Sequence, residues 1–494
     1  MKKIFNSRKT GKIILSALTV LSLSLAGNPT VLACTTFIAG RAVTADGSRI
    51  IGRNDDSEDL DVVKIVRRPA FNKKAPWTFT STETNFTAQL PAHGYSYLAL
   101  PSAGLKPGYG TWDEAVLNDH QVCLTATESI YANPTALVAD PYVKNGIDES
   151  VLPTIVIPYV STALAGVEFL GSLLAQYGST EGNAVVFADA KETWYMEIYT
   201  GHQWAAIRFP EDRYAVIAND SLLGNLDVTD TANVRTSPNL VKLAREHHFL
   251  QENNGQIHMA HTYGAPHRDY SQLRIWAAQK KLSPSQIGDY NVDTTYTLLQ
   301  KPDHQISLAE AMDLFRYRYE DTAYNANTHP NNRAIGINRT AEAHFFWLRD
   351  DKPQTLWVAL ANPEMSIFLP LYGNVTKMPE AFTLEAATYN KDSAYWKFRS
   401  LSALAVQDRT GYGQEVRSTW RKMELDLIKN MPDLDAQYRA AGSTSQAANK
   451  LCGDVANKAL HTADTLYQKT WTAFMLSTVQ DGNSKNATAN KDTH

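Results

Sequence analysis

Cys34 and a polar run that begins at Arg53 are the residues whose types and positions suggest chemistry. The thiolate is the nucleophilic form of cysteine, and a nearby cation such as Arg53 lowers the pKa of a thiol. If the chain were cut after Ala33, Cys34 would carry a thiol and a free α-amine, whose reference pKa values are about 8.5 and about 7.7–8.0. Such a residue could attack a carbonyl, form a thioester and pass a proton to the leaving amine.

The segment before Cys34 has the three parts of a secretory signal peptide. Residues 1–12 are basic, residues 13–26 (IILSALTVLSLSLA) are apolar, and Val31-Leu32-Ala33 offers small or apolar residues before a cut. The apolar run is shorter than the ~20 residues that a membrane span needs. We therefore expect residues 1–33 to be a leader that is removed, and the mature protein to be secreted, with no stable membrane span.

Two non-catalytic roles of Cys34 stay open. Residues 31–34 (VLAC) also resemble a lipobox, in which Cys34 would carry lipid and anchor a binding module at the cell surface, although Leu32 is unusual at its position. The cysteine could also merely follow the cut. A lipoprotein normally continues into a flexible polar tether, whereas residues 35–43 are rich in β-forming residues. The sequence after the cysteine therefore favours catalysis.

A β-hairpin is predicted to begin at the cysteine. Asp46-Gly47 is a strong two-residue turn signal, and residues 48–52 return as a second strand. A turn centred there pairs positions whose numbers sum to about 93, which would place Cys34 opposite Glu58 and Asp59. The polar run at residues 53–56 would then lie at the same end of the hairpin as the cysteine.

These features resemble peptidase family C69, the cysteine dipeptidases, which are related to the bile-salt hydrolase and penicillin V acylase group of N-terminal nucleophile hydrolases. The resemblance starts with CTT at residues 34–36 and GRNDD at residues 52–56, and it spans roughly residues 34–375. Further similar stretches lie at residues 117–129, 197–204, 215–220, 268–276 and 339–344. The resemblance implies a four-layer αββα sandwich, dipeptide substrates, a thiol mechanism and no cofactor or metal.

The resemblance also implies roles for single residues. Arg53 would steady the thiolate, and Asp56 would orient the α-amine. Asn219, which follows a predicted strand at residues 214–218, would donate an amide N–H to the oxyanion, and one such donor can be worth about 10²–10³ in rate. Arg274 matches a distal active-site arginine.

Glu128 departs from the acylase pattern, which has a second asparagine at the corresponding strand. A carboxylate cannot donate an N–H, so we expect Glu128 to bind the free α-ammonium of the substrate, which would favour dipeptides over N-acylated compounds. An N-acyl amidase of the bile-salt or penicillin V type, with the same fold, is the alternative.

Composition excludes several classes of protein. The chain has 494 residues, and a chain starting at residue 34 would keep 42 basic and 51 acidic residues, a net charge of −9 that argues against nucleic-acid binding. Three cysteines exclude a disulfide framework. Cys123 is predicted to be a buried thiol, and whether it pairs with Cys452 stays open. His258-x-x-His261 lacks a third metal ligand.

The sequence predicts an α+β fold in successive regions. Residues 34–380 would form the catalytic domain, in which short strands alternate with helices. Residues 381–480 have helical apolar spacing and would cover the core or contact a second copy in a homo-oligomer. Residues 481–494 are polar and predicted to be disordered. Predicted strands include residues 184–188, 194–199, 214–218 and 356–361; predicted helices include residues 238–246, 308–317, 395–404, 416–428 and 455–474.

Overall fold

The computed structural model describes residues 34–57, 60–104, 111–384 and 387–489. Within these residues the fold is α+β, with antiparallel sheets and many helices. The predicted signal peptide at residues 1–33 lies outside the described residues. No helix of the described part has the length and apolar character to cross a membrane.

A six-stranded antiparallel sheet contains the start of the described chain. Its strand order is β15-β1-β2-β20-β21-β22. The strands are β1 (Thr35–Ala39), β2 (Arg49–Asp56), β15 (Tyr214–Ile217), β20 (Thr340–Leu348), β21 (Thr355–Leu360) and β22 (Leu369–Tyr372). The predicted strands at residues 214–218 and 356–361 are thus confirmed as β15 and β21.

A larger sheet has the order β17-β14-β13-β12-β11-β10-β9-β3, and β4 also pairs with β9. Its strands are β3 (Asp61–Val63), β4 (Val66–Arg68), β9 (Tyr97–Gly104), β10 (Thr111–Asn118), β11 (Cys123–Glu128), β12 (Asn183–Ala188), β13 (Thr193–Ile198), β14 (Trp204–Arg208) and β17 (Val234–Thr236). The predicted strands at residues 184–188 and 194–199 are confirmed as β12 and β13.

Short strands and helices surround these sheets. The small strand pairs are β5 (Phe71–Asn72) with β8 (His93–Gly94), β6 (Trp77–Thr80) with β7 (Thr87–Leu90), and β16 (Asn225–Leu226) and β18 (Glu252–Asn253) on either side of β19 (Gln256–His258). The helices are α1 (Pro134–Ala139), α2 (Leu152–Val156), α3 (Ala163–Tyr177), α4 (Leu240–Glu246), α5 (Met259–Tyr263), α6 (Asp269–Leu282), α7 (Leu308–Arg316), α8 (Ala394–Ala405), α9 (Tyr412–Ala440) and α10 (Ser445–Ala489).

The predicted register of the first hairpin is wrong. Strand β1 ends at Ala39, and β2 begins only at Arg49, so the connection is longer than a two-residue turn. The chain leaves the sheet early because the backbone N–H groups of Arg41 and Ala42 donate to Glu211, and a 3₁₀ turn follows. Thr35 therefore pairs with Asn54. This register brings Cys34 to Asp55 instead of the predicted Glu58 and Asp59.

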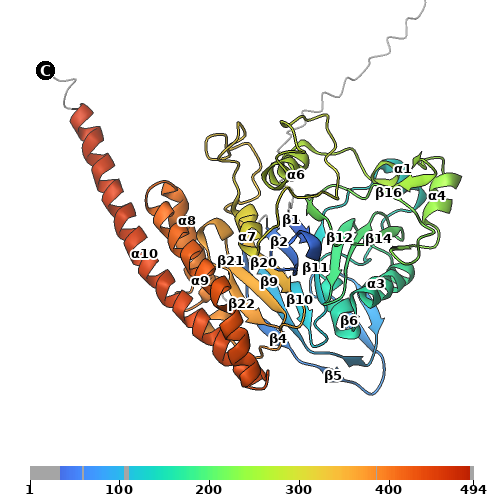
Figure 1. Ribbon diagram of the computed structural model, residues 1–494, viewed down its shortest axis with the longest axis horizontal. Coiled ribbons are helices and arrows are strands. Elements are labelled where there is room, and N and C mark those ends of the chain that lie inside the picture. The colour runs from blue at the N-terminus through green and yellow to red at the C-terminus, as the bar shows by residue number, and fades with distance from the viewer. Residues whose placement is uncertain (1–33, 58–59, 105–110, 385–386, 490–494) are drawn as a thin grey trace, which may run out of the picture. The chain divides into compact units, whose positions relative to one another are not determined.

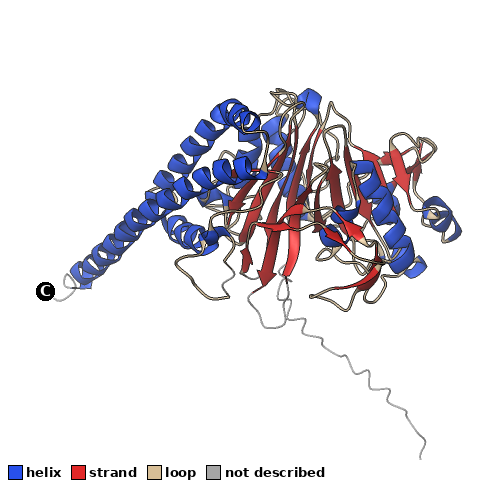
Figure 2. Ribbon diagram, turned by 90° about the horizontal axis from the view of Figure 1, so that it is seen from below, coloured by secondary structure: helices blue, strands red, loops and turns tan. Residues whose placement is uncertain are grey.

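The two large sheets share one hydrophobic core. Phe37 and Ile51 of the six-stranded sheet belong to the same buried cluster as Leu117 and Val186 of the larger sheet. A second cluster lies between the larger sheet and α2 and α3. On the six-stranded sheet, α7 packs through Phe315, whose ring centroid lies 4.4 Å from that of Phe345. Figures 1 and 2 show the strands in the middle, with helices on either side.

Helices α8, α9 and α10 lie in the C-terminal region predicted to be helical, and they pack against β21, β22 and one another (Figure 1). Two ion pairs hold α9 against the α+β core. Arg349 Nη1 lies 2.7 Å from Asp435 Oδ2, and Arg316 Nη2 lies 2.5 Å from Glu424 Oε1. These pairs join helix α7 and the residue after β20 to α9.

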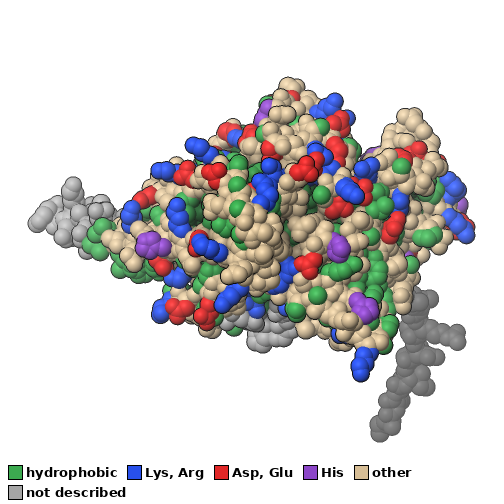
Figure 3. Space-filling model, turned by 60° about the horizontal axis from the view of Figure 1, so that its bottom comes forward, with side chains coloured by type: hydrophobic (Ala, Val, Ile, Leu, Met, Phe, Trp, Pro, Cys, Tyr) green, Lys and Arg blue, Asp and Glu red, His purple; other side chains and the backbone are tan. Residues whose placement is uncertain are grey.

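Helix α10 continues to Ala489, into the stretch predicted to be disordered. A helix adds residues more easily than it nucleates, and no proline interrupts this one, so the polar tail extends it. Before that point Trp471, Met475, Leu476 and Val479 are exposed apolar side chains. Figure 3 shows hydrophobic side chains on the surface beside the grey C-terminal end, whereas acidic and basic side chains are intermixed over the rest of that face.

Candidate active site

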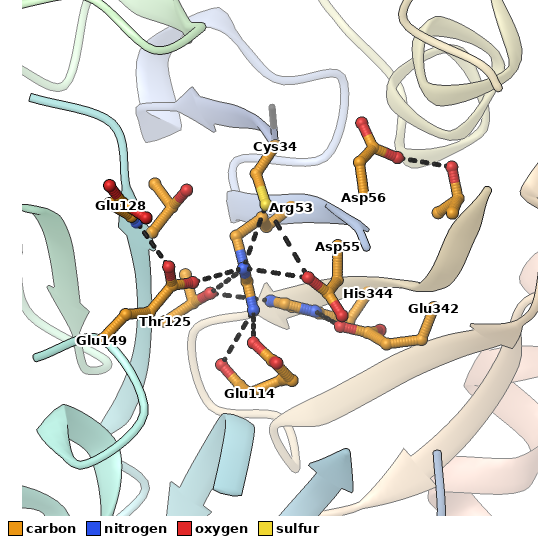
Figure 4. A network of polar contacts seen from close by, with 12 residues as sticks. Cys34, Arg53, Asp55, Asp56, Glu114, Thr125, Glu128, Glu149, Glu342 and His344 are labelled. Atoms are coloured by element: carbon orange, nitrogen blue, oxygen red, sulfur yellow. Dashed lines mark hydrogen bonds and ion pairs between the residues drawn. The ribbon is translucent and has the colours of Figure 1, made fainter. Parts of the chain in front are cut away.

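Cys34 lies immediately before β1, buried between the hairpin and the larger sheet. Arg53 Nη1 donates to its sulfur at 3.4 Å, and the thiol lies 3.7 Å from Asp55 Oδ1 (Figure 4). Burial raises the pKa of the Cys34 thiol far above its ordinary value, Arg53 opposes the rise, and the charge of Asp55 adds to it. In this environment the thiol holds its proton unless a nearby base accepts it.

Arg53 is the centre of the charge network in Figure 4. Its guanidinium is fully buried and contacts Asp55, Glu114 and Glu149, at 3.6 Å for Asp55 and 3.1 Å for Glu149. Burial raises the pKa of all three carboxyl groups, and repulsion from Glu114 raises the pKa of Asp55 and Glu149 further. One guanidinium therefore faces three carboxyl groups beside the thiol. Some of these carboxyl groups stay protonated at pH values above the usual pKa of a carboxyl group.

A second layer of polar residues holds Arg53 in place. Arg53 Nε donates to Thr125 Oγ1 at 3.0 Å, and the same hydroxyl lies 3.1 Å from Nε2 of His344. The second ring nitrogen of His344 lies 2.8 Å from Glu342 Oε1. Glu342 and His344 share a face of β20, because side chains two residues apart in a strand point the same way. Both are fully buried.

Thr125, Glu342 and His344 are functional candidates to which the sequence assigned no role. Residues 339–344 resemble the family, but the resemblance implied nothing for these side chains. The available signal was an alternation of Glu342 and His344 with apolar residues in a strand, where a buried polar side chain needs a partner. The partner, Thr125, lies on the larger sheet and could not be found from spacing along the chain.

Asp56 lies on the opposite face of β2 from Arg53. It accepts hydrogen bonds from Arg333 Nη2 at 2.6 Å and Thr340 Oγ1 at 2.5 Å. The pairing of β2 with β20 shifts register between Asp55 and Asp56. Asp55 is the carboxylate in contact with the sulfur, and the role predicted for Asp56, to orient the α-amine of Cys34, stays a prediction.

Arg274 joins Cys34 to Asn219. From α6, its Nη1 donates to the Cys34 carbonyl at 2.6 Å and to Thr35 Oγ1 at 3.0 Å, and its Nη2 donates to Asn219 Oδ1 at 2.6 Å. Burial and the charge of Arg333 lower the pKa of Arg274 to about 10, so it remains a cation at neutral pH. The predicted residues Cys34, Asn219 and Arg274 are therefore brought together.

Asn219 begins a tight turn after β15. Its φ of +42° lies in the left-handed region, which asparagine tolerates better than most residues. Its Nδ2 donates to the backbone carbonyl of Glu128 at 3.2 Å. The side-chain amide is thus held between Arg274 and the end of β11.

Glu197 holds the turn that follows Asn219, a role that the sequence did not predict. Its Oε1 accepts from the backbone N–H groups of Leu222 at 2.8 Å and Leu223 at 3.2 Å, and its Oε2 accepts from Ser221 Oγ at 2.7 Å. The carboxylate is fully buried on β13. A buried acid with these donors fixes the backbone that presents Asn219.

Glu128 ends β11 beside further acids. Its backbone N–H donates to Glu149 Oε2 at 2.6 Å, and the Glu149 N–H donates to Glu181 Oε1 at 2.7 Å. Burial and the charge of Glu128 raise the pKa of Glu181 to about 8. Glu128 itself is half-buried. This acidic row extends from Arg53 to the predicted ammonium-binding residue.

The described residues hold no cluster of histidine, cysteine and acidic side chains able to bind a metal ion. All three cysteines are buried and free, so Cys123 and Cys452 do not pair. Cys123 is the buried thiol that the sequence predicted.

Comparison with known proteins indicates the class of enzyme to which this chain belongs. The model of peptidase family C69 matches residues 33–422, and the chain belongs to this family of peptide hydrolases. A protein of Streptococcus pyogenes serotype M1 named probable dipeptidase B is 32% identical over 92% of this chain and 94% of its own length. A probable dipeptidase of Salmonella dublin is 32% identical over 71% of this chain and 83% of its own. A probable dipeptidase of Latilactobacillus sakei is 29% identical over 79% and 84%.

Proposed function

We propose that the mature protein begins at Cys34 and hydrolyses dipeptides as a secreted cysteine dipeptidase of the N-terminal nucleophile type. The contact of the Cys34 sulfur with Arg53 and Asp55 carries this proposal. Family membership and the dipeptidase names of the relatives support it. Two sheets with a shared core and helices beyond them support the αββα sandwich of such enzymes. The sequence of the leader supports secretion.

In the proposed reaction the free α-amine of Cys34 accepts the thiol proton, and Arg53 stabilises the thiolate. The sulfur attacks the scissile carbonyl carbon, and the oxyanion receives an N–H from the side chain of Asn219. The carbon–nitrogen bond then breaks, and the α-ammonium returns its proton to the leaving amine. Water attacks the resulting thioester, with the amine as base, and releases the first amino acid and the thiol.

Several further residues position these groups. Arg274 holds the Cys34 carbonyl and the Asn219 amide at a fixed separation, because it donates to both. Thr125, His344 and Glu342 orient the Arg53 guanidinium from behind. Asp56 and Arg333 fix the opposite face of β2. The thiol therefore meets a preorganised cation, as electrostatic catalysis requires.

Glu128 is the proposed partner of the substrate α-ammonium. The contacts of its backbone with Glu149, which pairs with Arg53, and with Asn219 support this role. We expect Glu128→Gln to raise the KM for a dipeptide about 10-fold or more, since a hydrogen bond to a charged group contributes about 1.5–3 kcal/mol. An unchanged KM would remove Glu128 from substrate binding. Turnover of glycocholate or penicillin V in place of dipeptides would instead identify the N-acyl amidase.

The test of the function is dipeptide hydrolysis by a chain that starts at Cys34. The matched variants are Cys34→Ala in the same chain and a chain that keeps Ala33, which leaves the thiol but blocks the amine. We expect both to lose at least about 10³-fold in kcat. Equal activity of Cys34→Ala would overturn the proposal. Mass spectrometry of the exported protein would reveal a lipid-anchored binding module through a diacylated Cys34.

A further inference from the structure

Arg268 presents a positive charge over the ring of Tyr131, three residues after Glu128 in the chain. It is the residue before α6, and its guanidinium carbon lies 3.3 Å from the centre of the Tyr131 ring. Its Nη1 also donates to the hydroxyl of Tyr270 at 2.8 Å. Among the residues that the structure describes, no carboxylate lies within ion-pair distance of this guanidinium. The side chain is half-buried, so part of the guanidinium group stays accessible to a ligand.

The backbone of Arg268 contacts the segment that carries Asn219. The Arg268 backbone N–H lies 3.4 Å from Oδ1 of Asp220, the neighbour of Asn219. The segment before Arg268 runs along the chain that follows Glu128, because Ala265 N donates to Tyr131 O at 2.6 Å. Tyr131 responds to both charges: burial and the charge of Glu128 raise its pKa, Arg268 opposes the rise, and the resulting pKa is about 12.

Helix α6 sets the spacing between Arg268 and the nucleophile. Arg274, which binds the Cys34 carbonyl, lies on the same helix. Six residues of helix advance by about 9 Å at 1.5 Å per residue. A dipeptide in extended conformation spans at most ~7 Å. The helix rise exceeds the span of the dipeptide by about 2 Å, which is less than the length of an arginine side chain, so the Arg268 guanidinium can approach the end of a substrate bound at Cys34.

We infer that Arg268 binds the α-carboxylate of the substrate's C-terminal residue, which makes the site select dipeptides with a free C-terminus. This inference rests on the proposed function and deepens it. The planar guanidinium matches a carboxylate with two parallel hydrogen bonds, and Tyr131 and Tyr270 hold its orientation before the substrate arrives. Glu128, whose charge also acts on Tyr131, supplies the opposite sign, so the site offers one charge for each end of a dipeptide.

The test compares a dipeptide, its C-terminal amide and a tripeptide extended at the C-terminus. The enzyme is the chain beginning at Cys34, with Arg268→Met and Arg268→Lys as variants. Lys281→Met is the matched control, because Lys281 is a cation on the same helix above the Tyr317 ring. Thermal unfolding verifies that each variant is folded.

The wild type should prefer the dipeptide over the amide and the tripeptide by about 10- to 100-fold in kcat/KM, the range of a charge-assisted pair. In Arg268→Met, kcat/KM for the dipeptide should fall by that factor while kcat/KM for the amide stays unchanged, so that the two substrates become equal. Arg268→Lys should have a preference for the dipeptide between that of the wild type and that of Arg268→Met. Lys281→Met should have the preference of the wild type.

Equal turnover of the dipeptide and its amide by the wild type would overturn the inference and leave the dipeptidase function intact. The same fall on both substrates in Arg268→Met would mean a structural role and would also overturn it. A wild type inactive on every peptide would overturn the proposed function together with this inference.

Discussion

At the scale of single residues, Arg53 balances the charges of the site. Arg53→Met would leave Asp55, Glu114 and Glu149 facing one another in a buried space. Removing one partner of a buried ion pair costs about 3–5 kcal/mol, and we expect a loss of this size in the free energy of unfolding. Urea denaturation measures it. Arg208→Met, which breaks an exposed pair with Glu192, is the control and should cost under about 1 kcal/mol.

The same change should slow the reaction of Cys34 with iodoacetamide. Arg53 is the charge that lowers the pKa of this thiol against the effect of burial. Without it the thiolate fraction falls at every pH below the thiol pKa. An alkylation rate as fast as that of the wild type would mean that Arg53 does not stabilise the thiolate.

Glu181 gives stability a defined pH dependence. Its pKa is about 8 in the folded protein, against about 4.3 for an unperturbed glutamate. The folded state therefore binds more protons, and this group lowers the free energy of unfolding as pH rises from about 4.3 to about 8. By urea denaturation, the stability of Glu181→Gln relative to the wild type should be greater at pH 8 than at pH 5. An identical pH slope in both proteins would contradict this.

At the scale of elements, Gly52 lets β20 lie close against β2. A Cβ at this position would lie 2.4 Å from a ring carbon of Phe345 and 2.7 Å from the carbonyl of His344. Gly52→Ala should therefore cost about 1–3 kcal/mol of stability, as overpacked cores do, and displace His344. Gly288→Ala, which meets no atom within 4 Å, is the control for unfolding and activity assays. Equal effects of the two changes would show that β2 and β20 can move apart without loss of stability or activity.

The first hairpin and most strands could be predicted from the sequence because their residue types are local signals. The register could not, because contacts with Glu211, far along the chain, end β1 early. That shift brings Asp55, in place of the predicted Glu58 and Asp59, opposite Cys34. Arg53 and Cys34 were correctly placed together, whereas Glu114 and Glu149 reach Arg53 from the larger sheet and a loop. Such long-range contacts have no spacing rule along the sequence.

At the scale of the whole molecule, the C-terminal helices belong to the core. Trp420 of α9 is buried and donates from its indole N–H to the Met365 carbonyl at 3.1 Å. Glu364, also buried, pairs with Arg409 and Arg417. The sequence predicted the helices from their apolar spacing, yet the surface they cover follows only from these tertiary contacts.

A chain that ends at residue 392 should therefore fail to fold as a soluble monomer, since it exposes β22 and removes both ion-pair partners of Glu364, Arg409 and Arg417. A chain that ends at residue 480 keeps these contacts and should unfold at the temperature of the full chain. Size-exclusion chromatography and thermal unfolding separate the outcomes. A monomeric, cooperatively folded chain ending at 392 would show that the helices are an independent appendage.

The most direct measurement of the central claim is the intact mass of the enzyme quenched in acid during turnover of a slow dipeptide. The proposal predicts a chain beginning at Cys34 that carries the mass of the substrate's N-terminal residue as a thioester on Cys34, removable by hydroxylamine and absent from Cys34→Ala. Turnover with no such adduct, at a rate that Cys34→Ala matches, would contradict it.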